Sequence, residues 1–389
     1  MVKLIFGFVF SFLLYSCNSS SDLITSQTKE VQFQLLDSIL VESLSELYLV
    51  DRKAETGELL FKEKQLKEIL LTDSKGKILL KPNIKGEGPS QVAQPWELAF
   101  WGNGIAIKEI SPEMRVHFFN SSMEKIRRSE PLAEGINMLE VAPLRNQFKA
   151  VEIDGKTLLI GADANAVTPK LMGKDFQNSN FYSLAESGFI IDSQTGVSQK
   201  INLYPDSWLP RKEGRWVGMS TPFFTGTTKS QLVAVLPRIG DQLFLFKLRG
   251  NELIPYQEVL INHPDRKRNL KFNVEDEPLL YPGFFDLKAG GTIFLAHFYT
   301  EVPREPYLAM KNGKVNTNRN PEFAALLKNY RKSRYLLIDE KGSQSPITKL
   351  PIEGEIHFID QEDVIYIKPD SEVEKDYNVF YRYKIFFKN

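Results

Sequence analysis

The sequence predicts an all-β protein, a six-bladed β-propeller whose blades are four-stranded antiparallel sheets. Hydrophobic residues make up 42% of the chain and aromatic residues 12%, a composition suited to densely packed strands. Short apolar runs are repeatedly followed by Asp or Asn, then by Gly, then by a second apolar run, which is the pattern of β-hairpins. Because such hairpins recur along the whole chain, we expect a repeat architecture built from β-sheets.

The hairpins group into six units of four strands. In the clearest copies an Asp ends the first strand and a Gly follows in the turn. These copies lie at 47–61, 69–80, 189–201 and 335–347. With their partner hairpins they give blades at about 44–85, 94–130, 146–207, 217–262, 283–352 and 355–389. Since the last blade lacks a fourth strand, we expect a strand at 31–40 to complete it and close the ring, which hides exposed sheet edges.

One helix interrupts the strands. Asn320, Pro321 and Glu322 provide a cap, a first-turn proline and an early acid, and apolar residues follow at helical spacing. We therefore expect one short inserted helix near 321–332, on the fifth blade. The alternative architecture is a pair of β-sandwich domains, which requires a Pro/Gly-rich linker near the middle of the chain, and the sequence contains none.

The first residues have the pattern of a bacterial lipoprotein signal. Lys3 precedes an apolar run from Leu4 to Tyr15 that is too short to span a bilayer, and the small residue Ser16 stands before Cys17. Cys17 is the only cysteine of the chain. We expect cleavage before Cys17 and lipidation of its thiol, so that the protein is attached to a membrane through this residue. The alternative is an ordinary secretory signal with a chance cysteine.

The lipoprotein signal sets the expected domain plan and location. We expect a signal peptide at 1–16, a flexible Ser-rich tether at 17–29 and a single propeller domain at 30–389. Residue 18 is Asn rather than the Asp that retains lipoproteins in the inner membrane, which favours the outer membrane with the protein facing the periplasm. Exposure at the cell surface is the alternative.

Charge and motif content exclude several functions. Lys plus Arg and Asp plus Glu both number 49, so no net charge favours nucleic acid as a partner. The four histidines are isolated, without the pairings typical of metal sites, and we predict no metal and no cofactor. No Gly-x-Ser-x-Gly nucleophile motif is present, and the sequence identifies no catalytic residue.

Two loop segments carry the aromatic and arginine side chains that often dominate binding surfaces. The candidate binding residues are Trp208, Arg211, Arg215 and Trp216 in the first segment, and Tyr299, Arg304 and Tyr307 in the second. In the second segment Pro303 and Pro306 prevent strand pairing, which suggests a loop on one face of the propeller. The alternative is that these aromatic side chains seal the interfaces between blades.

The segment Gly86-Glu87-Gly88-Pro89 resembles the Gly-x-Gly-Pro signature of six-bladed propeller lipoproteins of Bacteroidetes-type bacteria, a family of unknown function. In that family the loop links the outer strand of one blade to the inner strand of the next. The resemblance implies this structural role for Gly86, Gly88 and Pro89. The chain has Ser90-Gln91 where the family usually has Gly and Glu. The resemblance implies no defined reaction.

Two functions compete on these observations. The first is a lipid-anchored binding or scaffolding propeller that holds a protein, peptide or glycan on one face without catalysis. The alternative is an envelope enzyme that acts on glycans or peptides through acids and histidines gathered at the central channel. Convergence of Asp286, His297, Glu301 and Glu305 in one pocket would favour the enzyme. A purely structural spacer is a third possibility.

Overall fold

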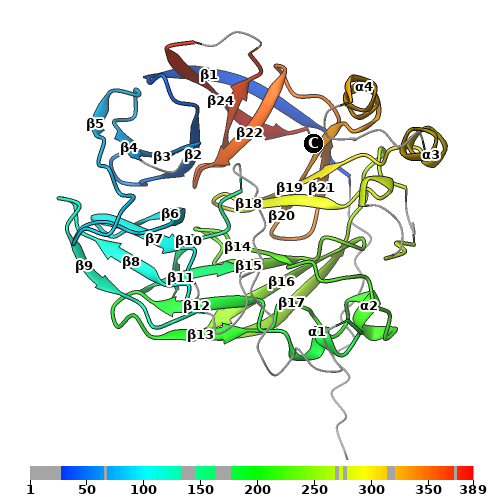
Figure 1. Cartoon of the computed structure of the whole chain (residues 1–389), viewed down its shortest axis with the longest axis horizontal. Coiled ribbons are helices and arrows are strands. Elements are labelled where there is room, and N and C mark those ends of the chain that lie inside the picture. The colour runs from blue at the N-terminus through cyan, green and yellow to red at the C-terminus, as the bar shows by residue number, and fades with distance from the viewer. Residues whose placement is uncertain are drawn as a thin grey trace, which may run out of the picture.

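Six four-stranded antiparallel sheets surround a central axis in the computed structural model of the chain, as Figure 1 shows. The structure describes residues 28–388 except 65–67, 112, 133–144, 154, 163–176, 268–270, 275–277, 313–319 and 372–374. The predicted fold class is confirmed. The expected signal peptide, Cys17 and most of the expected tether lie outside the described residues.

The first three blades follow the predicted boundaries closely. Blade 1 consists of β2 (Leu47–Arg52), β3 (Leu59–Glu63), β4 (Ile69–Thr72) and β5 (Ile78–Leu80). Blade 2 consists of β6 (Pro95–Trp101), β7 (Gly104–Glu109), β8 (Val116–Phe119) and β9 (Lys125–Arg128). Blade 3 consists of β10 (Lys149–Ile153), β11 (Lys156–Ala162), β12 (Gly188–Asp192) and β13 (Ser198–Ile201).

The second half of the ring has the same order of strands. Blade 4 consists of β14 (Phe223–Gly226), β15 (Leu232–Leu236), β16 (Gln242–Arg249) and β17 (Glu252–Leu260). Blade 5 consists of β18 (Phe284–Ala289), β19 (Ile293–Tyr299), β20 (Ser333–Asp339) and β21 (Gln344–Ile347). Blade 6 consists of β22 (Gly354–Ile359), β23 (Val364–Pro369), β24 (Tyr377–Phe387) and β1 (Val31–Glu42).

The ring is closed by contacts at its centre and at its edge. The inner strands β2, β6, β10, β14, β18 and β22 each contact the next one around the axis. At the edge of blade 6, β1 pairs antiparallel with β24, with Val31 opposite Phe387 and Glu42 opposite Tyr377. The predicted closing strand is therefore present. Just before this strand, Thr28 bridges Gln344 of blade 5, and the Lys29 N–H donates to the Gln344 carbonyl at 2.8 Å.

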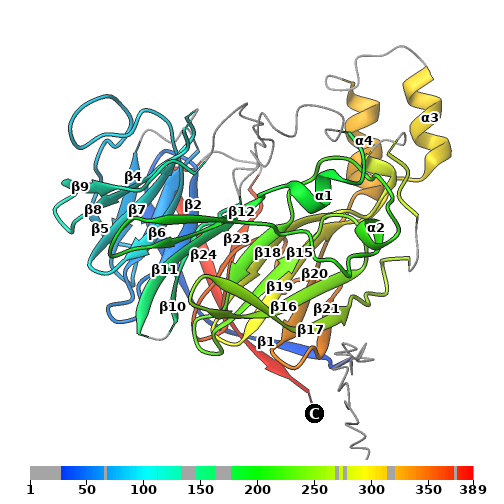
Figure 2. The ribbon, with the colours of Figure 1, turned by 90° about the horizontal axis from the view of Figure 1, so that it is seen from below.

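Strand alternation gives the propeller two different faces. Turns between the first and second strands of a blade, and between the third and fourth, lie on one face, which we call the hairpin face. Connections between the second and third strands, and between blades, lie on the other, which we call the connection face. Figure 2 shows α1 (Phe181–Leu184), α3 (Arg304–Asn312) and α4 (Pro321–Tyr330) on the opposite side of the propeller from the C-terminus.

The recurring Asp and Asn residues form side-chain turns on the hairpin face. In four blades the side chain of the residue that ends or directly follows the third strand accepts the N–H of the residue two positions later, at 2.8 to 3.0 Å. These residues are Asp73, Asn120, Asp192 and Asp339. The copy at Asn120 lacks a glycine, and Met123 takes its left-handed position with φ of 60°.

The helices differ from the prediction. The expected helix near 321–332 is α4, and the Asn320 side chain accepts the Glu322 N–H at 2.9 Å. The described residues also form α1, α2 (Leu209–Lys212), α3 and a 3-10 helix (Pro278–Leu280), none of which was predicted. The prediction of a loop around Arg304 is wrong, because this segment forms α3. Pro306 stands in its first turn, where a missing N–H costs no hydrogen bond.

Candidate functional site

Trp208 lies in the core rather than on the surface. Its side chain is fully buried, and its indole Nε1 donates to the Ile239 carbonyl at 2.9 Å. The ring packs edge-on against Tyr182, with 4.9 Å between ring centroids. Trp208 therefore fits the packing alternative, because a ligand has no access to it. Trp208 directly precedes α2 and packs in a core cluster formed with residues of blades 3 and 4.

The other three residues of the first segment are held by neighbouring groups. Trp216 is half-buried and stacks on Tyr182 at 5.4 Å. Arg211 pairs with Asp206 at 2.5 Å. Arg215 Nη1 donates to the Phe272 carbonyl at 3.1 Å, so this arginine fixes the backbone of a residue from the connection between blades 4 and 5. The first segment thus supports a surface beside it rather than forming one itself.

That surface is a cleft of about 410 Å³ on the connection face, between blades 4 and 5. We call it the aromatic cleft. Four connections meet there: those after β13, β15 and β17, and the two ends of the one between β19 and β20 that carries α3 and α4. Its lining includes the aromatic and arginine side chains of Arg238, Phe272, Tyr281, Phe285, Tyr299 and Arg331. Among the residues predicted from sequence, Tyr299 lines this cleft.

The aromatic cleft combines flat rings with positive charge. The Arg331 guanidinium lies over the Tyr299 ring, 4.4 Å from its centroid. Phe285 meets Tyr299 edge-on at 5.1 Å. Burial raises the pKa of the Tyr299 phenol, so its hydroxyl stays neutral. Two arginines and no acidic side chain appear among its described lining residues. The acidic run at 275–277, which follows Val274 in the sequence, lies outside the described residues.

A smaller pocket of about 230 Å³ adjoins the aromatic cleft across Phe272 and Tyr281. Lys267, Lys271 and Arg304 line it, together with Glu301, the one acid among its described lining residues. Lys267 pairs with Glu301 at 2.9 Å. Arg304, predicted from sequence, therefore lies in a basic pocket beside the cleft that contains Tyr299.

Tyr307 does not reach either opening. It is buried on α3 and packs against Phe323 of α4, with ring centroids 6.2 Å apart. Its role is to join the two helices, which again fits the packing alternative. Sequence reasoning missed Arg238, Phe272, Tyr281 and Arg331, because their connections are far apart in the chain and carry no shared motif.

The four residues that would have favoured an enzyme do not converge. Asp286 and His297 are 3% and 7% exposed, and Asp286 pairs with Lys288. Glu301 lies in the basic pocket, and Glu305 is exposed on α3. Burial lowers the pKa of His297 to about 3, so this histidine is neutral at ordinary pH. In the described parts of the chain no group of three His, Cys, Asp or Glu side chains is arranged to hold a metal ion.

Charged side chains buried in blades 1 and 2 have partners within the protein. Lys108 and Glu97 form a buried ion pair at 2.8 Å, and Glu97 also accepts the Gln147 N–H at 2.8 Å. Lys62 donates to the Arg145 carbonyl at 3.0 Å, and burial lowers the pKa of Lys62 to about 8. A channel cavity beside Asp51 measures about 30 Å³, room for about one or two waters. That cavity is too small for a sugar or peptide.

The glycine loop links β5 to β6, the outer strand of blade 1 to the inner strand of blade 2. Gly86 has φ of 152°, and a Cβ there would lie 2.2 Å from Oε1 of Gln91. The Gly88 N–H donates to the same Oε1 at 3.0 Å. The side chain of Gln91, two residues after Pro89, thus packs against Gly86 and holds the loop through the hydrogen bond from Gly88.

Comparison with known proteins supports the fold. No protein-family model and no curated protein matches the sequence. A member of the DUF4221 family from Bacteroides vulgatus is similar in structure, with TM-score 0.66 and 12% identity over 93% of this chain and 100% of that one. A Bacteroides fragilis protein described as exported has TM-score 0.50 and 11% identity, covering 95% of this chain and 98% of that one. At these identities the likeness shows a shared fold alone.

None of the helices in the described residues has the length and apolar composition needed to cross a bilayer.

Proposed function

We propose that this chain is a lipid-anchored binding protein of the bacterial cell envelope that holds a partner in the aromatic cleft. The observation that carries the proposal is the pairing of Arg331 with Tyr299 in an open cleft of about 410 Å³. Clefts of this size, lined by aromatic rings and a few convergent polar groups, are typical ligand sites. Aromatic and arginine side chains also dominate the energetics of protein interfaces.

The charge of the cleft favours an anionic partner. Arg238 and Arg331 line the aromatic cleft, and Lys267, Lys271 and Arg304 line the basic pocket beside it, where Glu301 is the one acid among the described lining residues. An acidic peptide segment with an aromatic or apolar side chain matches both features. A charged glycan that stacks on the rings is the second form of the same proposal.

The position of the first described residues, Thr28 and Lys29, agrees with presentation of this cleft away from a membrane. Thr28 bridges Gln344, next to the turn of blade 5 that lies on the hairpin face, and Lys29 pairs with Asp339 at 3.8 Å. The aromatic cleft lies on the connection face. If Cys17 carries lipid, the ten residues between it and Thr28 reach at most roughly 40 Å. The structural likeness to an exported Bacteroides protein is consistent with the envelope location.

The test is capture of partners from detergent-solubilised envelopes by the full chain, with a glycan array run on the same preparation. Tyr299→Ala removes a ring of the cleft. Tyr256→Ala, an exposed tyrosine of β17 on blade 4, is the matched control. We expect a partner that the native chain and Tyr256→Ala retain and Tyr299→Ala loses. Equal capture by both variants would contradict the assignment to this cleft.

A further inference from the structure

The paired ends of β1 and β24 project from the hairpin face. Val31 lies opposite Phe387, so the two strands stay paired to the end of β24. The pairing of β24 with its other neighbour, β23, stops earlier, at Lys384. The last three residues of β24 therefore extend about 10 Å beyond that pairing. Figure 2 shows this end of β24 on the side opposite α3 and α4. We call residues 31–36 and 385–387 the ribbon tip.

The ribbon tip is apolar on both of its sides. Phe386 and Phe387 are 44% and 36% exposed. Because consecutive residues of a strand point to opposite faces, their rings lie on opposite sides of the ribbon. Leu35 and Leu36 of β1 are 52% and 46% exposed. Single exposed apolar side chains are ordinary, whereas four on two paired strand ends are typical of an interaction site.

The charged groups around the ribbon tip have partners within the protein. Lys388 pairs with Glu30 at 2.5 Å, and Lys29 pairs with Asp339 at 3.8 Å. The Lys384 ammonium donates to a backbone carbonyl in the first turn of blade 6. These contacts leave apolar surface as the main feature of the tip. Such a surface fits a lipid bilayer, which gains free energy by burying apolar side chains, better than it fits a charged partner.

The expected lipid anchor lies close to the ribbon tip along the chain. If Cys17 carries lipid, the ten residues between it and Thr28 span at most roughly 40 Å. Thr28 stands only three residues before Val31, the first residue of the tip. The anchor thus keeps the tip near the membrane at a high effective concentration, so that burial of a few side chains suffices for a lasting contact.

On the basis of the proposed lipid anchor, we propose that the ribbon tip inserts into the surface of the bilayer that holds the anchor. Phe386 and Phe387 enter the boundary between the headgroups and the acyl chains, and Leu35 and Leu36 follow at the headgroup level. This contact gives the propeller a fixed orientation. The hairpin face points toward the membrane, and the aromatic cleft, on the connection face, points into the aqueous phase.

The test is tryptophan fluorescence of the full chain in phosphatidylcholine vesicles, with and without bromine on the acyl chains. Brominated lipids quench an indole ring that enters the bilayer. Phe386→Trp places a reporter at the ribbon tip, and Tyr377→Trp, an exposed position at the other end of β24, is the matched control. The emission of the native chain, which has four tryptophans, is subtracted. Flotation of the vesicles measures attachment.

We expect all three chains to float with the vesicles. Bromine should reduce the emission added by Phe386→Trp and leave the emission added by Tyr377→Trp unchanged. Phe387→Trp provides a second reporter if Phe386→Trp alters the fold.

The other outcomes separate the membrane contact from the anchor. Flotation without quenching at the tip would overturn the contact and leave the anchor intact. Equal quenching of Phe386→Trp and Tyr377→Trp would mean that the propeller has no fixed orientation, which also overturns the contact. Absence of flotation would contradict the anchor and the contact together. A shift of the tip reporter to shorter wavelength without quenching would mean that protein, such as a second copy of the chain, covers the tip.

Discussion

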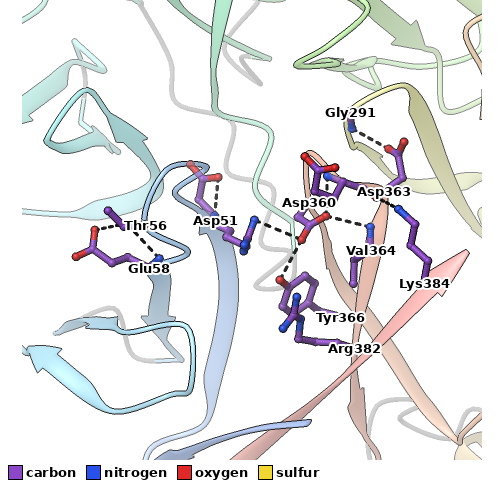
Figure 3. A network of polar contacts seen from close by, with 12 residues as sticks. Asp51, Thr56, Glu58, Gly291, Asp360, Asp363, Val364, Tyr366, Arg382 and Lys384 are labelled. Atoms are coloured by element: carbon purple, nitrogen blue, oxygen red, sulfur yellow. Dashed lines mark hydrogen bonds and ion pairs between the residues drawn. The ribbon is translucent and has the colours of Figure 1, made fainter. Parts of the chain in front are cut away.

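Arg52 forms an ion pair with Asp360 at 3.6 Å, which joins the inner strand of blade 1 to the first turn of blade 6. Figure 3 shows the network around Asp360, whose carboxylate also accepts the Val364 N–H at 3.0 Å and the Tyr366 hydroxyl at 3.1 Å. Asp363 in the same turn accepts the Gly291 N–H of blade 5 at 2.8 Å. Side-chain contacts on the hairpin face thus join blade 6 to blades 1 and 5, in addition to the pairing of β1 with β24.

We predict that Asp360→Asn destabilises the fold by about 2 kcal/mol. The amide keeps an oxygen for the backbone donors, but the largely buried Arg52 loses its counter-ion. Asp192→Asn is the matched control, because its turn accepts backbone N–H groups and the described residues give it no ion pair. Urea unfolding measures the free energy of unfolding of both variants. Equal stability of the two variants would show that the ion pair contributes nothing.

The carboxyl of Asp51 gives a pH dependence in the acid range. Burial raises the pKa of Asp51 to about 6, against the opposing hydrogen bond from the Phe100 N–H at 2.8 Å. The folded state therefore keeps a proton that the unfolded chain has lost between about pH 4 and 6, and stability from this group falls as pH rises through that window. Between pH 4 and 6.5 the free energy of unfolding should therefore decrease by roughly 2 kcal/mol less in Asp51→Asn than in the native chain. Urea unfolding at the two pH values measures this difference. An unchanged pH profile would refute it.

His297 acts in the opposite direction. With a pKa of about 3 in the folded state, it stays neutral while the unfolded chain takes up a proton below about pH 6.5, so stability is lost as pH falls. The ring packs against Tyr335 at 4.6 Å and Tyr299 at 4.8 Å. We expect His297→Phe to keep this packing and to lose less stability than the native chain between pH 6.5 and 4. A steeper loss in the variant would contradict the burial argument.

Trp208 should matter for stability and not for binding. We predict that Trp208→Phe costs about 1–3 kcal/mol of unfolding free energy, because it removes the hydrogen bond to Ile239 and leaves a cavity. Trp216→Phe, at a half-buried position, should cost less. Thermal unfolding compares the stability of the two variants, and the partner's affinity for the folded variants compares their binding. A loss of affinity at native stability in Trp208→Phe would mean that its ring contacts the ligand.

Local chemistry explains which parts of the fold were predictable. The turns at Asp73, Asp192 and Asp339 depend on one side chain bonding to the backbone two residues later, so their signal lies within a few residues. The closing strand β1 was also predictable, because blade 6 lacked one strand. Pro306 was misread, since a proline that breaks a strand equally well begins a helix.

The candidate site was less predictable for a geometric reason. Tyr299 and Arg331 lie at the two ends of an insertion that carries α3 and α4, and Phe272 comes from the connection before blade 5. Their meeting depends on how blades 4 and 5 pack, which leaves no periodic signal in the chain. Residue type alone singled out Trp208 as well as Tyr299, and only burial separates them.

The central claim is that an anionic partner binds the aromatic cleft. The most direct test is to measure the Kd of that partner for two arginine variants of the chain. Arg331→Ala removes the guanidinium over Tyr299, whereas Arg249→Ala removes an exposed arginine at the end of β16. We predict at least about tenfold weaker binding for Arg331→Ala, a native Kd for Arg249→Ala, and a salt dependence that is smaller in Arg331→Ala. Native affinity in Arg331→Ala would contradict the account and place the partner elsewhere on the propeller.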